Sequence, residues 1–268
     1  MHRAKRFVAA SLVFAVSAAA QDATRPASAP PNHVPFGVGE RLEYDVRFGL
    51  RLLPEVHVGS ASMEVAGLDT VRGRETWHTV FAVHGGFRVY RVDDKYESWF
   101  DTETFASLRY VQDINEGNYD RERRYEIYPG QHFQIDSQPP QPTVERPLDE
   151  ASFLYFLRTI PLTVGKDTSF MDYFRPDRNP VRIRVVKKDR IRVPAGEFNA
   201  LVVEPVIVNT KIFSEGGGAR VWLSDDDNRI MLQMKSKLWF GSLNLYLKSY
   251  RPTSANQAKT AQPTTPSP

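Results

Sequence analysis

The residues best suited to metal chemistry in this sequence are histidines on segments that alternate like strands. His78 and His84 share one predicted strand, where six residues of separation place them about 20 Å apart, too far to bind one metal ion. His57 could meet His78 across neighbouring strands, but two histidines without a nearby acid of matching parity make a poor zinc site. We interpret these histidines as structural or solvent-facing, and the sequence predicts neither a metal site nor a cofactor.

A pair of acids, Glu97 and Asp101, flanks Trp99 on one predicted strand, with roughly 13 Å between the two carboxylates. Either acid could take part in general acid–base catalysis only with a partner from another strand, so a solvated strand face is the preferred interpretation. The alternative is an envelope hydrolase that pairs one of these acids with a histidine of a neighbouring strand. It requires a carboxylate and an imidazole about 3 Å apart in a cleft.

Recognisable catalytic motifs are absent from the sequence. None of Ser98, Ser152 and Ser224 lies in a G-x-S-x-G motif, and a chain without cysteine cannot be a thiol hydrolase. Neither H-E-x-x-H nor a P-loop occurs. The acidic run at 225–228 lacks the glycine and the distal glutamate of an EF-hand loop, so it predicts a hairpin turn. The sequence therefore favours a non-catalytic protein.

Composition and charge indicate a folded, exported protein. The chain of 268 residues is 41% hydrophobic and 25% charged, as in ordinary globular proteins. Residues 1–20 have the form of a secretory signal peptide, with three basic residues, an apolar run and the small residues Ala18 and Ala20. Without those three basic residues, the 35 of the whole chain fall to 32, which equals the number of acidic residues. We therefore expect no nucleic-acid partner, and a periplasmic location if the source is Gram-negative.

The remainder of the chain divides into one domain and two tails. Residues 21–35 and 252–268 are rich in proline and small polar residues, and we expect them to be disordered because they cannot bury enough apolar surface. Residues 36–251 are long enough to form a single β-rich domain with a sizeable core. No stretch of about twenty apolar residues follows the signal peptide, so no transmembrane segment is expected.

Apolar and polar residues alternate through most of this domain. At 41–48 the even-numbered residues are apolar and the odd-numbered residues are charged, which predicts a strand with one buried face. Short turns between successive strands indicate an antiparallel meander. The further strand candidates are 55–66, 75–84, 87–91, 95–101, 106–113, 120–128, 131–135, 181–185, 190–194, 198–208, 219–224, 229–239 and 243–247.

One segment has helical periodicity instead. Apolar residues at positions 153, 156, 157 and 160, with Asp149 as N-cap and Pro161 as the stop, predict a helix over 149–160. Arg158, near its end, either interacts with the dipole at the helix C-terminus, which is the preferred interpretation, or anchors an acidic head group at a cavity mouth. A second, short helical piece is expected around 170–174.

About a dozen amphipathic strands and one apolar helix cannot lie flat without leaving a whole apolar face in water. The sequence therefore predicts an all-β, mainly antiparallel domain with a strongly curved sheet or barrel-like meander. The internal helix near 149–160 is expected to fill part of the opening, with its apolar stripe against the sheet.

Five segments of the domain follow one another in a distinctive order. They are 37–44 (GVGERLEY), 96–101 (YESWFD), 148–158 (LDEASFLYFLR), 221–226 (VWLSDD) and 229–232 (RIML). Together they resemble domain-of-unknown-function family 3108, a group of exported bacterial proteins. The resemblance extends over nearly the whole of 36–251, although Met231 stands where the family pattern leads us to expect a proline. Membership implies an exported domain without an assigned activity and carries over no catalytic residues.

The hypothesis that best fits these patterns is non-catalytic binding of an apolar or amphiphilic envelope component, such as a lipid, between the sheet and the helix. Aromatic residues are first of all core material, but in a sheet too wide to be filled they line a pocket. Besides the hydrolase, a protein-interaction or assembly module with an exposed edge strand or apolar patch stays open. The predicted ligand-binding residues are Tyr44, Phe48, Trp77, Phe81, Tyr96, Phe100, Phe156, Arg158 and Trp239.

Overall fold

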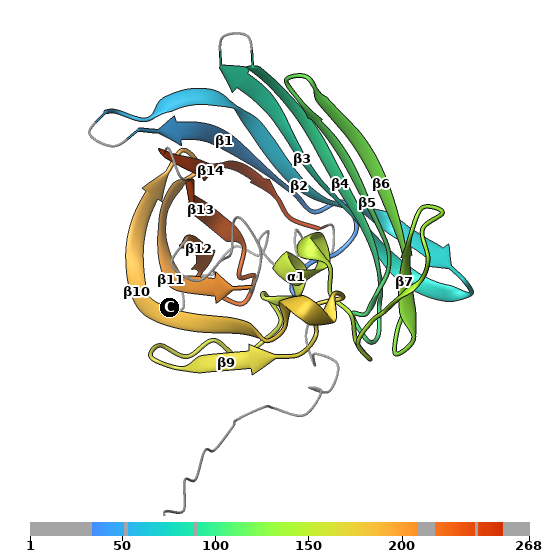
Figure 1. Cartoon of the computed structure of the whole chain (residues 1–268). Coiled ribbons are helices and arrows are strands. Elements are labelled where there is room, and N and C mark those ends of the chain that lie inside the picture. The colour runs from blue at the N-terminus through green and yellow to red at the C-terminus, as the bar shows by residue number, and fades with distance from the viewer. Residues whose placement is uncertain (1–33, 51–52, 88–89, 208–217, 239–240, 254–268) are drawn as a thin grey trace, which may run out of the picture.

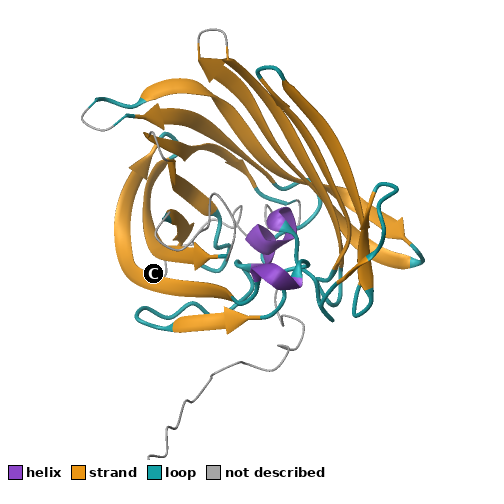
Figure 2. Cartoon of the chain, in the orientation of Figure 1, coloured by secondary structure: helices purple, strands orange, loops and turns teal. Residues whose placement is uncertain are grey.

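The computed structural model describes residues 34–50, 53–87, 90–207, 218–238 and 241–253. The predicted signal peptide, most of the two predicted tails and Trp239 lie outside these residues. The described residues form one fourteen-stranded sheet and one α-helix, α1 (Glu150–Phe156) (Figure 2). The strands are β1 (Arg41–Gly49), β2 (Val56–Val71), β3 (Arg74–Phe87), β4 (Tyr90–Asp101), β5 (Ser107–Glu116), β6 (Tyr119–Tyr128), β7 (His132–Ile135), β8 (Gln141–Pro142), β9 (Asp167–Phe170), β10 (Val181–Val193), β11 (Gly196–Val206), β12 (Ala219–Ser224), β13 (Met231–Leu238) and β14 (Gly241–Arg251).

The sheet is a meander with two arms that join at the first and last strands. β1 to β8 follow one another along one arm, β9 to β14 along the other, and β14 pairs with β1. All neighbouring strands are antiparallel. The sheet curls around α1 but does not close, since β8 and β9 stay as its two edges (Figure 1). The predicted all-β, curved antiparallel architecture is thus confirmed.

Main-chain hydrogen bonds tie the two arms together where the sheet is open. The Leu148 amide donates to the Asp172 carbonyl at 2.6 Å, and the Phe174 amide donates to the Leu148 carbonyl at 3.0 Å. On the other side, the Ser107 amide of β5 donates to the Pro147 carbonyl at 2.7 Å. The segment between β8 and α1 therefore lies between the two arms, and its buried backbone groups are satisfied without forming a regular strand.

The helix begins where the sequence predicts. Asp149 is its N-cap, and its Oδ1 accepts hydrogen bonds from the amides of Ala151 at 2.9 Å and Ser152 at 2.8 Å. Ser152 returns the bond, because its hydroxyl oxygen accepts from the Asp149 amide at 2.9 Å. This reciprocal arrangement satisfies donors that the first turn of a helix otherwise leaves free.

The helix is shorter than the predicted 149–160. It ends at Phe156 rather than before Pro161, because the next turns tighten. The Arg158 amide donates to the Tyr155 carbonyl at 3.1 Å, and the Thr159 amide donates to the Phe156 carbonyl at 2.9 Å. Bonds between residues three apart are typical of a helix end.

Two strand predictions also need correction. The separate candidates at 181–185 and 190–194 form one strand, β10, whose register shifts between Val185 and Lys187. Residues 187–190 within this strand are charged and mostly exposed, so the apolar alternation is interrupted there and the sequence pattern reads as two strands. The helical piece expected around 170–174 is absent from the described chain there: β9 ends at Phe170, and a short 3₁₀ turn follows only at Pro176–Arg178.

The core fills the space between α1 and the curved sheet. Phe36 packs edge-on against Tyr155 of the helix, with ring centroids 4.8 Å apart, and Phe156 packs against Phe170 at 5.3 Å. Tyr155 and Phe156 are almost completely buried. The aromatic residues near the helix therefore belong to a continuous core that joins both arms.

Candidate functional site

The inward-facing side chains of β3 to β6 change from buried to partly buried along the strands. Near α1, Thr79, Phe100, Tyr110 and Tyr125 are at most 3% exposed. Farther along the same strands, the inward-facing side chains other than Asp94 are only partly buried. We call this second part the open wall. Its members are Phe81, Val83, Tyr96, Gln112, Ile114, Arg121 and Arg123.

The open wall runs from apolar to basic across the strands. Phe81 of β3 lies opposite Tyr96 of β4, Tyr96 opposite Gln112 of β5, and Gln112 opposite Arg123 of β6. Phe81 and Tyr96 contact each other, with ring centroids 6.1 Å apart. Neighbouring strands are about 4.8 Å apart, and three such spacings separate β3 from β6. The backbones at Phe81 and Arg123 are therefore about 14 Å apart. One side of this strip can bury hydrocarbon, and the other can bind negative charge.

The structure brings only two of the predicted ligand-binding residues, Phe81 and Tyr96, together on this wall. Tyr44, Phe100 and Phe156 are fully buried in the core instead. The Tyr44 hydroxyl donates to a main-chain carbonyl at 3.0 Å, so that side chain is held inside the barrel. These three rings contribute to packing between the helix and both arms.

The other predicted residues lie apart from one another. Trp77 is partly buried against Phe36, with ring centroids 5.6 Å apart, and its indole nitrogen is buried with no hydrogen-bond partner in the described part of the chain. Phe48 is partly buried near the end of β1, opposite Leu243 of β14. Trp239 is not among the described residues.

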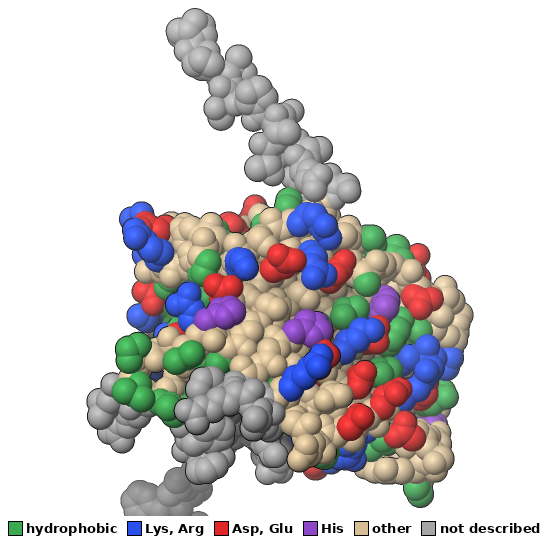
Figure 3. Space-filling model, turned by 90° about the horizontal axis from the view of Figure 1, so that it is seen from above, with side chains coloured by type: hydrophobic (Ala, Val, Ile, Leu, Met, Phe, Trp, Pro, Cys, Tyr) green, Lys and Arg blue, Asp and Glu red, His purple; other side chains and the backbone are tan. Residues whose placement is uncertain are grey.

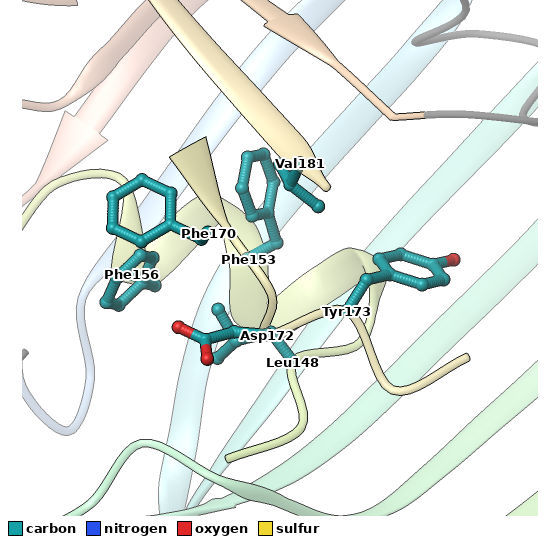
Figure 4. Close-up of a pocket in the computed structure, with 7 residues that line it drawn as sticks. All are labelled: Leu148, Phe153, Phe156, Phe170, Asp172, Tyr173 and Val181. Atoms are coloured by element: carbon teal, nitrogen blue, oxygen red, sulfur yellow. The ribbon is translucent and has the colours of Figure 1, made fainter. Parts of the chain in front are cut away.

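A small pocket lies beside α1, where the sequence suggested that a ligand would bind between the helix and the sheet. Its side chains leave essentially no space even for a water molecule, whereas ligand pockets measure about 300–1,000 Å³. Its one acidic side chain, Asp172, is bound to Arg146 at 2.7 Å. Figure 4 shows the rings of Phe153, Phe156 and Phe170 close together, whereas the Tyr173 ring points away from them. The lining residues are Leu148, Phe153, Phe156, Phe170, Asp172, Tyr173 and Val181.

Arg158 binds a buried carboxylate rather than the end of the helix. Its guanidinium donates to both oxygens of Glu40, at 2.6 and 2.9 Å, and both side chains are at most 1% exposed. It also donates to the carbonyls of Pro35 at 3.2 Å and Asn228 at 3.0 Å. Burial alone would lower the pKa of Arg158, but the charge and hydrogen bonds of Glu40, with smaller effects of Tyr155 and Tyr250, together outweigh burial and raise the pKa. The preferred interpretation as a helix cap is therefore wrong.

A buried carboxyl group lies among the apolar residues of the open wall. Asp94 of β4 is 4% exposed, and burial raises its pKa to about 6. The Asn115 amide donates to this carboxyl at 3.0 Å and opposes the shift, while the nearby charge of Glu116 adds to it. The charge of Asp94 thus changes near pH 6, which is close to the pH of many natural environments.

His78 and Glu97 meet the distance that the hydrolase hypothesis requires, but on the outward face of the sheet. The two side chains are 3.1 Å apart, Lys95 binds the other oxygen of Glu97 at 2.9 Å, and the imidazole stacks on Trp99 at 4.3 Å. Ser98, between Glu97 and Trp99, is fully buried on the inward face. Viewed from above, basic and acidic side chains lie next to one another over the surface (Figure 3). The His78–Glu97 pair is thus one of several ion pairs between neighbouring strands.

The remaining acids and histidines do not form a catalytic or metal site. Asp101 is buried, not solvated as expected, because its oxygens accept from the Thr104 amide at 2.7 Å and bind Arg74 at 2.8 Å. His57 does not meet His78, since the two lie opposite different partners in the sheet. In the described ranges, no group of three histidine, aspartate or glutamate side chains could hold a metal ion.

The edges of the sheet give little support to strand addition by a partner protein. β8 has two residues and ends in Pro142, and β9 has four. Short edge strands and proline are the usual protection against edge-to-edge pairing.

The α-helix of the described residues, α1, has seven residues. No helix in this part of the chain is long and apolar enough to cross a bilayer.

Sequence reasoning missed the two inward-facing arginines of the open wall. A signal was present, because Arg121 and Arg123 have the same parity as Tyr125 and Ile127, which are buried on the same strand. Charged residues that continue the apolar face of a strand must either find partners inside or face an opening.

Comparisons with known proteins agree with this architecture. A family model described as "Protein of unknown function (DUF3108)" matches residues 43–248. The beta-barrel-like protein of domain of unknown function DUF1849 from Brucella abortus has 13% sequence identity and a TM-score of 0.55, over 82% of this chain and 99% of that one. A "putative lipoprotein" from Parabacteroides distasonis has 11% identity and a TM-score of 0.33, over 84% of this chain and 100% of that one. No curated protein matches the chain. At these identities the Brucella structure supports the fold alone.

Proposed function

This chain belongs to the family of proteins of unknown function DUF3108, and we propose that it binds an apolar or amphiphilic molecule of the cell envelope without catalysis. The binding site in this proposal is the open wall. It replaces the space between sheet and helix that the sequence suggested, because side chains fill that space.

The observation that carries the proposal is the incomplete burial of Phe81, Val83 and Tyr96 on an inward face. In a closed barrel, strands on the opposite side would cover such residues. Here the sheet stays open between β8 and β9, and α1 covers only the part of β3 and β4 that lies next to it. A hydrocarbon chain on this wall would bury apolar surface that folding leaves partly in contact with water.

The outward-facing residue next to Phe81 provides a matched test. Phe81→Gln places a polar group on the open wall, whereas Val80→Gln makes a polar change on the opposite face of the same strand. Burying a phenylalanine side chain contributes about 1.5–3 kcal/mol, so we expect at least about tenfold weaker binding of a fluorescent dodecanoic acid by Phe81→Gln alone. Equal losses in both variants, or no saturable binding by the unmodified protein, would contradict the proposed site.

The envelope location in this proposal depends on export through residues 1–20. Expression of the full chain in a Gram-negative host, followed by mass measurement of the purified protein, should give a mass that corresponds to a start at Gln21. Native mass spectrometry of the same material should also detect a bound lipid. Recovery of an uncleaved protein in the cytoplasm would remove the envelope from the proposal, while a ligand-free protein would argue against the binding function.

A further inference from the structure

The basic end of the open wall contains arginines that lack the partners buried arginines normally have. Arg123 faces inward from β6 and has no hydrogen bond or ion pair with any described residue, and its Nε atom is buried. Arg121, two residues earlier on the same face, donates to the Tyr119 hydroxyl at 3.1 Å. Removing part of a guanidinium from water without a partner costs free energy. A site that receives a charged ligand would supply the missing partner.

Two more arginines come from the 3₁₀ turn before β10. Arg178 donates to the Tyr173 hydroxyl at 2.9 Å and lies 3.5 Å from Glu150, and Arg175 lies 3.6 Å from Asp177. The Nε atoms of Arg175 and Arg178 are both buried and have no hydrogen-bond partner in the part of the chain that the structure describes. We call Arg121, Arg123, Arg175 and Arg178 the arginine cluster.

Three arginines of the cluster lie near the Tyr125 hydroxyl of β6, at the edge of the core. Burial raises the pKa of the Tyr125 hydroxyl and Glu150 adds to the rise, while the charges of Arg175, Arg121 and Arg178 oppose it. Phe174, next to Arg175 in the chain, packs edge-on against Tyr125 with ring centroids 5.4 Å apart, so the 3₁₀ turn follows a segment that contacts the inward face of β6. Arg123 lies between Arg121 and Tyr125 on the same face of the strand.

The charges around the cluster leave an excess of positive charge. Four guanidinium groups face two carboxylates, those of Glu150 and Asp177, at the distances given above. The acids of β4 and β5 lie farther along the wall: Glu116 is opposite Tyr119, and Asp94 is two strands from Arg121, about 10 Å away. An anion is therefore best placed near Arg123, which has no carboxylate partner among the described residues.

We propose that the arginine cluster binds the phosphate oxygens of an anionic group, with the rest of an amphiphile lying toward Phe81 and Tyr96. This inference rests on the proposed function and specifies the ligand as an anionic amphiphile. Guanidinium groups bind phosphate with paired, charge-assisted hydrogen bonds, and four of them from two segments can surround one group. The same chemistry would also bind free phosphate, so the test must separate the two sources.

The strand β6 offers a matched control. Arg121→Gln/Arg123→Gln removes two charges from the inward face, and Arg124→Gln removes one charge from the outward face, where Arg124 binds Glu126 at 2.9 Å. Because Arg123 has no described partner, its replacement leaves no carboxylate without a cation. Thermal unfolding of each variant establishes that it is folded before binding is measured.

The probes are dodecyl phosphate, dodecyl maltoside and inorganic phosphate, each titrated by calorimetry below its micelle concentration where one exists. We expect the unmodified chain to bind dodecyl phosphate at least about tenfold more tightly than dodecyl maltoside. The inward double variant should lose that difference and bind both detergents equally. Arg124→Gln should bind like the unmodified chain.

The outcomes separate this inference from the proposed function. Equal binding of both detergents by the unmodified chain, unaffected by the inward double variant, would overturn the inference and leave the proposed function in place. Arginine-dependent binding of inorganic phosphate alone would support the anion site and argue against the amphiphile. Absence of binding by all three probes would overturn both.

Discussion

Arg158→Met is expected to destabilise the domain by about 3–5 kcal/mol, because it leaves the Glu40 carboxylate buried without its cation. The pair is bidentate, with distances of 2.6 and 2.9 Å, and both side chains are at most 1% exposed. Arg158 also satisfies the carbonyls of Pro35 and Asn228, so its loss affects the N-terminal segment and the turn between β12 and β13 together. For a domain of this size the shift in Tm should be about 6–20 °C.

The assay is urea unfolding followed by tryptophan fluorescence and circular dichroism, with a double-mutant cycle. Glu40→Leu should also destabilise the protein, but Arg158→Met/Glu40→Leu should cost clearly less than the sum of the two single changes, since neither charge is then left alone. Arg220→Met is the control, because Arg220 binds Glu204 at 2.6 Å with its side chain 54% exposed. It should change the free energy of unfolding by less than about 1 kcal/mol. Additive effects at Arg158 and Glu40, or a cost no larger than that of the control, would refute the reasoning.

Two other predictions concern Asp149 and the close contact of β2 with β3. Burial raises the pKa of Asp149 to about 6, against about 3.9 in an unfolded chain, so the folded protein holds this proton more tightly and stability falls as pH rises from about 4 to 6. Urea unfolding across this range should show Asp149→Asn removing on the order of 3 kcal/mol of that fall, and an unchanged pH profile would contradict the assignment. A Cβ atom on Gly59 would lie 2.2 Å from the His84 carbonyl, whereas one on Gly67 meets nothing within 4 Å. Gly59→Ala should therefore lower Tm by several degrees and Gly67→Ala should not; equal Tm values would show that the two strands can separate.

Local patterns predicted most of the elements, because each depends on neighbours in the chain. The alternation at 41–48 gives β1, and the acidic run at 225–228 forms the turn between β12 and β13. The Asp226 carboxylate accepts from the Asn228 and Arg229 amides at 3.0 Å, as the turn interpretation requires. Asp149 caps α1 because a carboxylate satisfies free amides in a first turn wherever that turn lies in the fold.

The candidate site was predictable only in part. Phe81 and Tyr96 follow from parity on two predicted strands, but parity does not distinguish a residue under the helix from one beyond it. Tyr44 and Phe100 also follow from strand parity and Phe156 from helical periodicity, yet all three are in the core. How far α1 covers the sheet depends on where the helix ends, and that end depends on tertiary contacts.

Amphipathic antiparallel strands and one capped helix could be predicted without a structure, because those properties arise from residues a few positions apart in the chain. The pairing of β14 with β1, and of Arg158 with Glu40, 118 residues away, exists only in the folded domain. In the folded domain the arginines of β6 also share an open face with Phe81. Such pairings follow from the curvature of the whole sheet, which the sum of many strand contacts sets and no local pattern records.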